Sequence, residues 1–137
     1  MAIHPKRSSI NFNRKANIHK VVLTGGPCAG KTTAITVIGD RLRERGFKVY
    51  CIPECATLVF GGGVTIDISK MTLQENIKFH RTLIQFIINQ EERFLEFANL
   101  TDDPTIILCD RGVFDVKAYM DPEGWQALMD ENGWNPV

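Results

Sequence analysis

A run of residues near the start of the chain has the types and spacing that suit phosphate binding. The run comprises Gly25, Gly26, Pro27, Cys28, Ala29, Gly30, Lys31, Thr32 and Thr33, and from Gly25 to Thr32 it fits the pattern G-x-x-x-x-G-K-[ST]. Glycines let the backbone curl around a phosphate with its N–H groups pointing inward, and the helix that follows adds the positive end of its dipole. Lys31 would place a positive charge against the outer phosphates. The segment 25–33 is therefore predicted to bind ATP or GTP through its phosphates.

Magnesium ligands can be assigned by the same reasoning. The Thr32 hydroxyl directly follows the lysine and is placed for Mg²⁺, and a carboxylate is expected at the end of a neighbouring hydrophobic strand. Asp110 follows the apolar run Ile106–Cys109 and fits this description. Arg111, the next residue, could bind a phosphate or a substrate anion. Alternatively it could pair with Asp110 or Asp115.

Glu54 is a third candidate, because it follows the predicted strand at 47–52. In parallel α/β sheets, ligands bind beyond the carboxyl ends of the strands. Glu54 and Asp110 should therefore share one crevice with residues 25–33. A carboxylate in that crevice can accept the proton of a hydroxyl that attacks the terminal phosphate. The alternative is a solvated loop acid beside Pro53.

The sequence D-P-E-G at 121–124 imitates the D-x-x-G motif of signalling GTPases. It follows a predicted helix rather than a strand, and an aspartate before a proline is a typical helix start. We therefore assign it no role in nucleotide binding. The N-K-x-D pattern that reads guanine does not occur in the sequence. The choice between ATP and GTP stays open.

Strands alternate with helices along the chain and would position these residues. Short apolar and β-branched runs predict strands at 20–24, 47–52 and 105–109, and helices are predicted at 32–45, 72–99, 113–120 and from 121 to about 132. Thr72 and Glu75 fit a capping box at the start of the longest helix. This alternation predicts an α/β class protein, a three-layer P-loop NTPase fold with a parallel sheet that ends after its third strand.

The composition is that of one small globular domain. The chain has 137 residues, of which 44% are hydrophobic and 23% charged. Its 16 basic and 16 acidic residues cancel, which argues against nucleic-acid binding, and no apolar stretch is long enough for a transmembrane segment. The cysteines lack the paired spacing of a zinc site and are expected as reduced thiols, mostly buried in strands or strand ends. Cys28 lies beside Lys31 and is expected to be the most reactive thiol.

Residues 1–18 are polar and basic and are predicted to form a disordered arm before a nucleotide-binding domain at 19–137. The arm has no apolar leader, which argues against secretion and favours a cytoplasmic protein. Its Arg and Ser content without acids would also suit a mitochondrial transit peptide. The same basic residues could contact an anionic lipid surface.

Together the motifs resemble a known group of P-loop proteins. The sequences VVLTGGPCAGKTT at 21–33, PECAT at 53–57 and IILCDRGVFDVKAYM at 106–120, with the long helix between them, are similar to one AAA-type domain. That domain is shared by NadR-type nicotinamide riboside kinases and TRPL-translocation-defect proteins.

The resemblance implies roles for individual residues. Residues 25–33 would bind the triphosphate, Asp110 would lie near Mg²⁺, and Glu54 and Arg111 would contact the acceptor substrate. Relatives carry further strands and an arginine-bearing lid after the position where this chain ends. Without such a strand, segment 20–24 would have an unpaired apolar edge. We therefore expect a marginally stable chain that either self-associates or needs further C-terminal sequence.

Three functions fit the sequence. The first is regulatory, Mg²⁺-dependent binding of ATP or GTP, with a change of conformation at Gly61–Gly63. The second is a kinase that transfers the γ-phosphoryl group to a nucleoside or nucleotide, in which Glu54 acts as base and Lys31 with Mg²⁺ stabilises the transferred group. The third is a noncatalytic interaction module with a vestigial phosphate loop.

Overall fold

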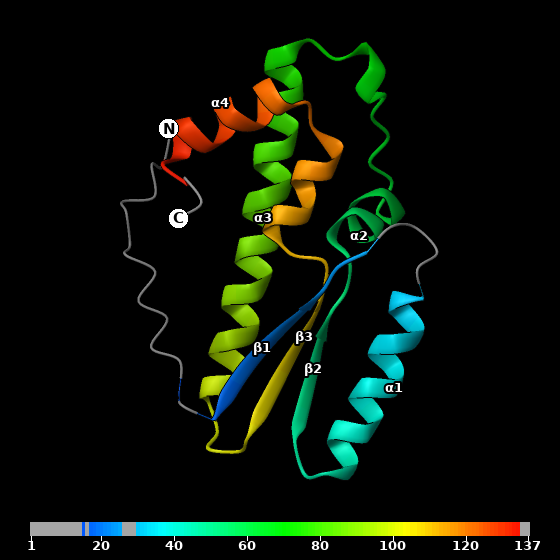
Figure 1. The fold of residues 1–137 in the computed structure, drawn as a ribbon, viewed down its shortest axis with the longest axis vertical. Helices are drawn as coiled ribbons and strands as arrows, with labels where there is room; N and C mark the ends of the chain where they lie inside the picture. The colour runs from blue at the N-terminus through cyan, green and yellow to red at the C-terminus, as the bar shows by residue number, and fades with distance from the viewer. Residues whose placement is uncertain (1–14, 16, 26–29, 135–137) are drawn as a thin grey trace.

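A three-stranded parallel sheet forms the centre of the fold (Figure 1). The structure is a computed structural model that describes residues 15, 17–25 and 30–134. In these residues the strand order is β1-β3-β2, which confirms the predicted α/β class and parallel sheet. The elements, with η for a 3-10 helix, are β1 (Ile18–Leu23), α1 (Lys31–Glu44), β2 (Lys48–Ile52), α2 (Cys55–Gly61), η1 (Ile68–Lys70), α3 (Leu73–Asn99), β3 (Thr105–Asp110), η2 (Val113–Tyr119) and α4 (Pro122–Asn132).

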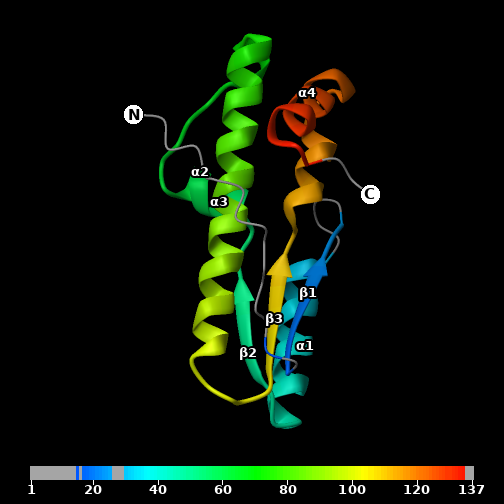
Figure 2. The same cartoon turned by 90° about the vertical axis from the view of Figure 1, so that its left-hand side faces the viewer.

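Helices α1 and α3 cover opposite faces of the sheet, as the edge-on view in Figure 2 shows. Side chains alternate between the two faces of a strand. On β3, Ile107 and Cys109 pack with Ala98 of α3 in one buried cluster. Leu108 points to the other face, where α1 contacts β2 and β3, and it is fully buried. The sheet is therefore the middle one of three layers.

Above the sheet, α2, α3, η2 and α4 enclose a second core. Its buried side chains come from all four helices, and they are Cys55, Ile84, Ile87, Val116, Trp125, Leu128 and Met129. This second core fixes η2 and α2 against α3. Both short helices directly follow the carboxyl end of a strand, so the core also fixes the segments that leave the sheet.

The two predicted helix starts are confirmed. The Thr72 hydroxyl accepts a hydrogen bond from the Glu75 backbone N–H at 3.2 Å, and the Glu75 carboxylate accepts one from the Thr72 N–H at 2.9 Å. Asp121 caps α4 by accepting from the Gly124 N–H at 2.7 Å, and Pro122 occupies the first turn. The D-P-E-G sequence is thus a helix N-terminus.

Some predicted boundaries and environments are corrected by the structure. Ile18, assigned to the arm, is the first residue of β1 and is buried against α3. Cys51 is exposed on β2, where it lines a cavity beside α1, whereas Cys55 and Cys109 are buried. Residues 113–119 form a 3-10 helix, and α2 and η1 were not anticipated. The rest of the predicted arm, 1–14 and 16, and Gly26–Ala29 of the phosphate loop lie outside the described residues.

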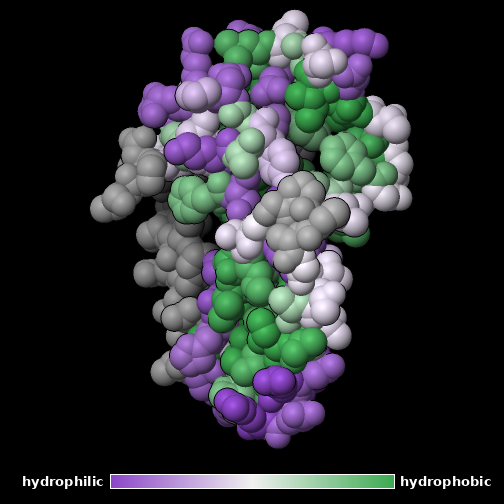
Figure 3. All heavy atoms as spheres, turned by 45° about the vertical axis from the view of Figure 1, so that its right-hand side comes forward, coloured by the Kyte–Doolittle hydropathy of each residue, from purple (hydrophilic) through white to green (hydrophobic). Residues whose placement is uncertain are grey.

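Strand β1 lies at an edge of the sheet and is partly uncovered, as the sequence predicted. Val21 remains 45% exposed, and Val37 and Ile38 of α1 are exposed as well. Figure 3 shows hydrophobic residues gathered on the lower half of this face, where the sheet and α1 lie. No helix in the described part of the chain combines the length and the apolar character that a membrane span requires.

Candidate functional site

The register of the sheet brings the ends of its three strands to one level. Leu23 of β1 pairs with Asp110 of β3, and Ile52 of β2 pairs with Cys109. The Arg111 N–H continues the β1 ladder by donating to the Leu23 carbonyl at 2.9 Å. Segments that leave the carboxyl ends of the strands therefore begin side by side, which is where ligands bind in parallel sheets.

The N-terminus of α1 begins at this edge and offers backbone N–H groups to an anion. Gly30 is its N-cap residue, and no described side chain caps the helix. Gly30 has a φ of 77°, a left-handed conformation that glycine adopts at little cost. The first turn carries Lys31, Thr32 and Thr33 and no acid, so its free N–H groups and dipole favour a phosphate.

Lys31 and Asp110 face each other across this edge. The Lys31 Nζ lies 4.0 Å from Asp110 Oδ1, and both side chains are nearly buried. Asp110 Oδ1 itself has no hydrogen-bond donor among the described residues. A buried carboxylate oxygen without a donor is costly unless a ligand or cation satisfies it.

This orphaned oxygen fits a magnesium ligand. Thr32 and Asp110 line the same cavity, so a hydroxyl and a carboxylate converge on one space. No group of three or more His, Cys, Asp and Glu side chains suited to a metal occurs in the described ranges. Mg²⁺ at nucleotide sites needs only one or two protein ligands, because phosphates and waters supply the rest. The residues present therefore fit the ion.

Glu54 and Arg111, the other predicted site residues, form an ion pair beside Asp110. Arg111 Nε lies 3.1 Å from Glu54 Oε1, and the guanidinium is mostly buried. The alternative partners considered for Arg111 are not used. Asp110 faces Lys31 instead, and Asp115 accepts a hydrogen bond from the Gly112 N–H at 2.6 Å.

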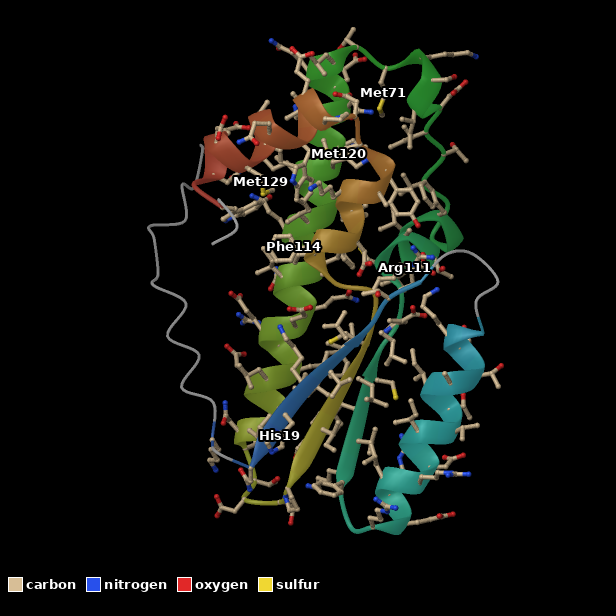
Figure 4. The ribbon with its side chains drawn as sticks, viewed as in Figure 1. His19, Met71, Arg111, Phe114, Met120 and Met129 are labelled. Carbon is tan, nitrogen blue, oxygen red and sulfur yellow. The ribbon has the colours of Figure 1, made fainter. Side chains whose placement is uncertain are left out.

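Arg111 adopts a strained backbone conformation at the centre of the site. Its φ is 67°, a left-handed value that costs a residue with a Cβ about 1–2 kcal/mol. Tyr119 holds its side chain by accepting a hydrogen bond from Nη1, and the Tyr119 ring centre lies 5.8 Å from Arg111 Cζ. Figure 4 shows Arg111 beside α2, above the carboxyl ends of the strands. Such strain persists where the surrounding contacts fix the residue.

Two cavities meet at Glu54 and Asp110. The first, here the α1 cavity, has a volume of about 650 Å³ and lies between α1, β2 and α2. The second, here the α3 cavity, has a volume of about 270 Å³ and lies between α2, α3 and η2. Glu54 and Asp110 line both cavities, whereas Thr32 lines the first and Arg111 the second. The two carboxylates thus lie at the boundary between the two cavities.

The sequence did not point to two residues of the α3 cavity. Tyr119 and His80 both line it, and His80 is buried. Tyr119 ends η2, whose turn brings it back to Arg111, and no sequence pattern encodes that return. His80 occupies the apolar side of a long helix, which is a weak signal on its own.

The described cysteines differ in environment. Burial raises the pKa of the Cys55 thiol to about 11 and that of the Cys109 thiol to about 12. The thiolate is the reactive form, so both are poor nucleophiles near neutral pH. The expectation for Cys28 falls outside the described residues.

The left-handed conformation of Arg111 predicts an inverted order of stability for two variants. Arg111→Gly and Arg111→Ala both lose the guanidinium and its contacts. Because only glycine relaxes at this φ, the free energy of unfolding of Arg111→Gly should exceed that of Arg111→Ala by about 1 kcal/mol. Urea unfolding followed by circular dichroism measures both values. An alanine variant as stable as the glycine variant would contradict the strain.

Comparison with known proteins gives one match. A family model described as an AAA domain matches residues 20–132, from β1 to α4. No curated protein and no solved structure matches the chain. The match covers most of the chain and supports a P-loop domain of the nucleotide-binding type, in agreement with the arrangement of α1 and Asp110 described above. The chain therefore belongs to this AAA-domain family.

Proposed function

We propose that the protein binds ATP or GTP together with Mg²⁺ at the carboxyl edge of its sheet. The observation that carries the proposal is the buried Oδ1 of Asp110, to which no described residue donates a hydrogen bond. It lies 4.0 Å from Lys31 Nζ, beside the start of α1, where no side chain of the described residues forms a cap. Phosphate oxygens would accept hydrogen bonds from the N–H groups at the start of α1, and a cation would bind the carboxylate oxygen. Lys31 would contact the outer phosphates.

Thr32 and Asp110 are the residues that would hold Mg²⁺. When bound, the ion would neutralise negative charge on the phosphate oxygens. Thr32 is exposed at the first turn of α1, where a hydroxyl can reach a ligand in the α1 cavity. Asp110 lines the opposite side of that cavity at the end of β3.

The position of the Gly61–Gly63 segment beside the α1 cavity supports a regulatory response to nucleotide. Gly61 and Gly62 line the α1 cavity together with Thr32. A ligand in this cavity would therefore contact both the phosphate-binding helix and the loop that follows α2. Every residue from Gly61 to Lys70 is exposed, so the loop can rearrange without breaking a core.

Two substitutions separate the role of the lysine from that of the metal ligand. Lys31→Ala removes a charge that acts directly on phosphate, so affinity for ATP or GTP should fall about 10- to 100-fold with or without Mg²⁺. Asp110→Ala should bind the nucleotide more weakly than wild-type protein in Mg²⁺. In EDTA the two proteins should bind it about equally, because Asp110 acts through the ion. Isothermal titration calorimetry measures both. Lys78→Ala, which changes an exposed lysine on α3 that lines neither cavity, is the control.

The outcome for Asp110 is decisive for the metal. Equal losses for Asp110→Ala in Mg²⁺ and in EDTA would remove that residue from the magnesium site. Retention of full affinity by Lys31→Ala would count against phosphate binding at α1.

A second candidate function, phosphoryl transfer to a small molecule, is favoured by the two cavities that share Glu54 and Asp110. In this reaction an acceptor hydroxyl in the α3 cavity attacks the γ-phosphorus of the nucleotide. A new P–O bond forms, the bond to the β-phosphate oxygen breaks, and the nucleoside diphosphate leaves. Glu54 accepts the hydroxyl proton, and Lys31 and Arg111 stabilise the charge on the transferred group. The resemblance to nicotinamide riboside kinases supports this reaction class.

The contacts of Glu54 position its carboxylate for the role of a base. The Arg111 Nε atom lies 3.1 Å from Glu54 Oε1 and fixes that oxygen at the end of β2. The Thr57 hydroxyl donates to the other oxygen, Glu54 Oε2, at 3.3 Å. Both contacts hold the carboxylate at the boundary between the two cavities.

Glu54→Gln tests the kinase directly. The amide cannot accept the proton, so transfer of labelled phosphate to a nucleoside panel should fall about 100- to 10,000-fold while triphosphate affinity stays within a few fold. Glu96→Gln, an exposed carboxylate on α3, is the matched control and should leave transfer unchanged. Undiminished transfer in Glu54→Gln would exclude Glu54 as the base.

The third candidate, a noncatalytic interaction module with a vestigial phosphate loop, makes the opposite prediction. A noncatalytic module would show neither triphosphate binding nor transfer in the wild-type protein. Binding without transfer would support the regulatory function alone.

A further inference from the structure

The contact between Arg111 and Glu54 is an ion pair without an aligned hydrogen bond. The Arg111 Nε atom lies 3.1 Å from Glu54 Oε1, close enough for attraction between the two charges. The same Nε atom is buried and has no hydrogen-bond partner among the described residues, so its N–H is not aligned with the carboxylate oxygen. Attraction between charges depends on distance rather than on angle. The ion pair alone therefore leaves the orientation of the guanidinium undetermined.

Tyr119 supplies the directional contact that the ion pair lacks. Arg111 Nη1 donates a hydrogen bond to the Tyr119 hydroxyl oxygen, and the centre of the tyrosine ring lies 5.8 Å from Arg111 Cζ. Within the described part of the chain, the guanidinium donates to no other group. Hydrogen bonds weaken steeply when they are misaligned, so this bond fixes the plane of the guanidinium.

The helix η2 fixes the position of Tyr119. Arg111 precedes this helix and Tyr119 ends it, so their hydrogen bond joins the two ends of η2. Val116 of η2 is buried in the second core, and Met120, the residue after Tyr119, packs against the same core. Tyr119 itself is 53% exposed and belongs to neither buried cluster. The packing of η2 therefore does not depend on the tyrosine hydroxyl.

A guanidinium without the Tyr119 bond would favour a different contact with Glu54. Arginine and a carboxylate commonly form two parallel hydrogen bonds, which use both carboxylate oxygens. The observed contact is less complete, because only Oε1 lies beside Arg111 Nε, and Glu54 Oε2 accepts a hydrogen bond from the Thr57 hydroxyl at 3.3 Å. A bidentate pair would occupy the carboxylate that the proposed reaction uses as its proton acceptor.

We propose that Tyr119 is a positioning residue of the phosphotransfer site, which holds the Arg111 guanidinium out of a bidentate pair with Glu54. Glu54 then remains able to accept the hydroxyl proton, and Arg111 remains able to stabilise charge on the transferred phosphoryl group. The inference rests on the proposed phosphoryl transfer and adds a residue that acts through Arg111.

Tyr119→Phe tests the role of the hydroxyl, because it removes that oxygen and keeps the ring. The kcat for transfer of labelled phosphate to the nucleoside panel should fall about 10- to 100-fold, the value of one hydrogen bond to a charged group. The KM for the triphosphate should stay within a few fold, because Tyr119 does not line the α1 cavity. An undiminished kcat, or a loss confined to KM, would overturn the proposal.

Tyr50→Phe is the matched control. Tyr50 lies on β2, its ring centre is 6.1 Å from that of Phe94, and it lines neither cavity. This variant should keep the wild-type kcat and KM. Thermal melts establish that both tyrosine variants are folded.

A double-mutant cycle tests whether Tyr119 acts through Arg111. Arg111→Gly removes the guanidinium and suits the left-handed backbone at this position. In this background, Tyr119→Phe should lower the single-turnover rate no further, because the group that it orients is gone. Losses that multiply would show that Tyr119 acts independently of Arg111, for example by touching the acceptor, and would refute a positioning role.

NMR of the Arg111 Nε–H group tests the contact without turnover. Its signal is assigned by its absence from the spectrum of Arg111→Gly. Side-chain ¹⁵N relaxation should show this group ordered in wild-type protein and mobile in Tyr119→Phe. A mobile group in wild-type protein would overturn the proposal even if the variant fails to fold, and so would equal order in the two proteins. The predicted change of order in a protein that transfers no phosphate would support the contact and refute the phosphotransfer function.

Discussion

The parallel pairing of β3 with both of its neighbours is the constraint on which the site depends. Because Leu23 lies opposite Asp110 and Ile52 opposite Cys109, the three strands end at one level. The chain that leaves β1 leads to the phosphate loop, the chain that leaves β2 leads to Glu54, and β3 itself ends in Asp110. A shift of one residue in either pairing would turn the side chains of the shifted strand to the opposite face of the sheet.

Arg111 connects this edge to the helices above it. Its backbone extends the β1 ladder through Leu23, its side chain pairs with Glu54, and Tyr119 holds the guanidinium from η2. The left-handed backbone allows the chain to turn sharply from the strand into η2. Gly112 then passes so close to β1 that a Cβ there would lie 3.1 Å from the Val22 Cγ1 atom. One strained residue thus connects the carboxyl edge of the sheet, the ion pair with Glu54 and the α3 cavity.

Local patterns predicted the elements, but long-range contacts decided the site. The capping box at Thr72 and the proline after Asp121 fixed helix starts because their hydrogen bonds lie within a few residues. The phosphate-loop pattern and the apolar run before Asp110 indicated which strand ends carry the candidate site. No such pattern reveals that Arg111 pairs with Glu54, which is remote in sequence, or that Cys51 is exposed. The α3 cavity likewise has no local signal, because it forms only when α2, α3 and η2 pack.

A thermal-shift series with triphosphate and diphosphate nucleotides, with and without Mg²⁺, tests the central claim most directly. If Lys31 binds the outer phosphates and Asp110 acts through the ion, ATP or GTP with Mg²⁺ should raise the melting temperature by several degrees. The same nucleotide in EDTA, and its diphosphate, should raise it less, because at a given concentration a ligand that binds more weakly stabilises the fold less. Equal shifts with and without Mg²⁺, or no shift with any nucleotide, would contradict a magnesium–nucleotide site at this edge of the sheet.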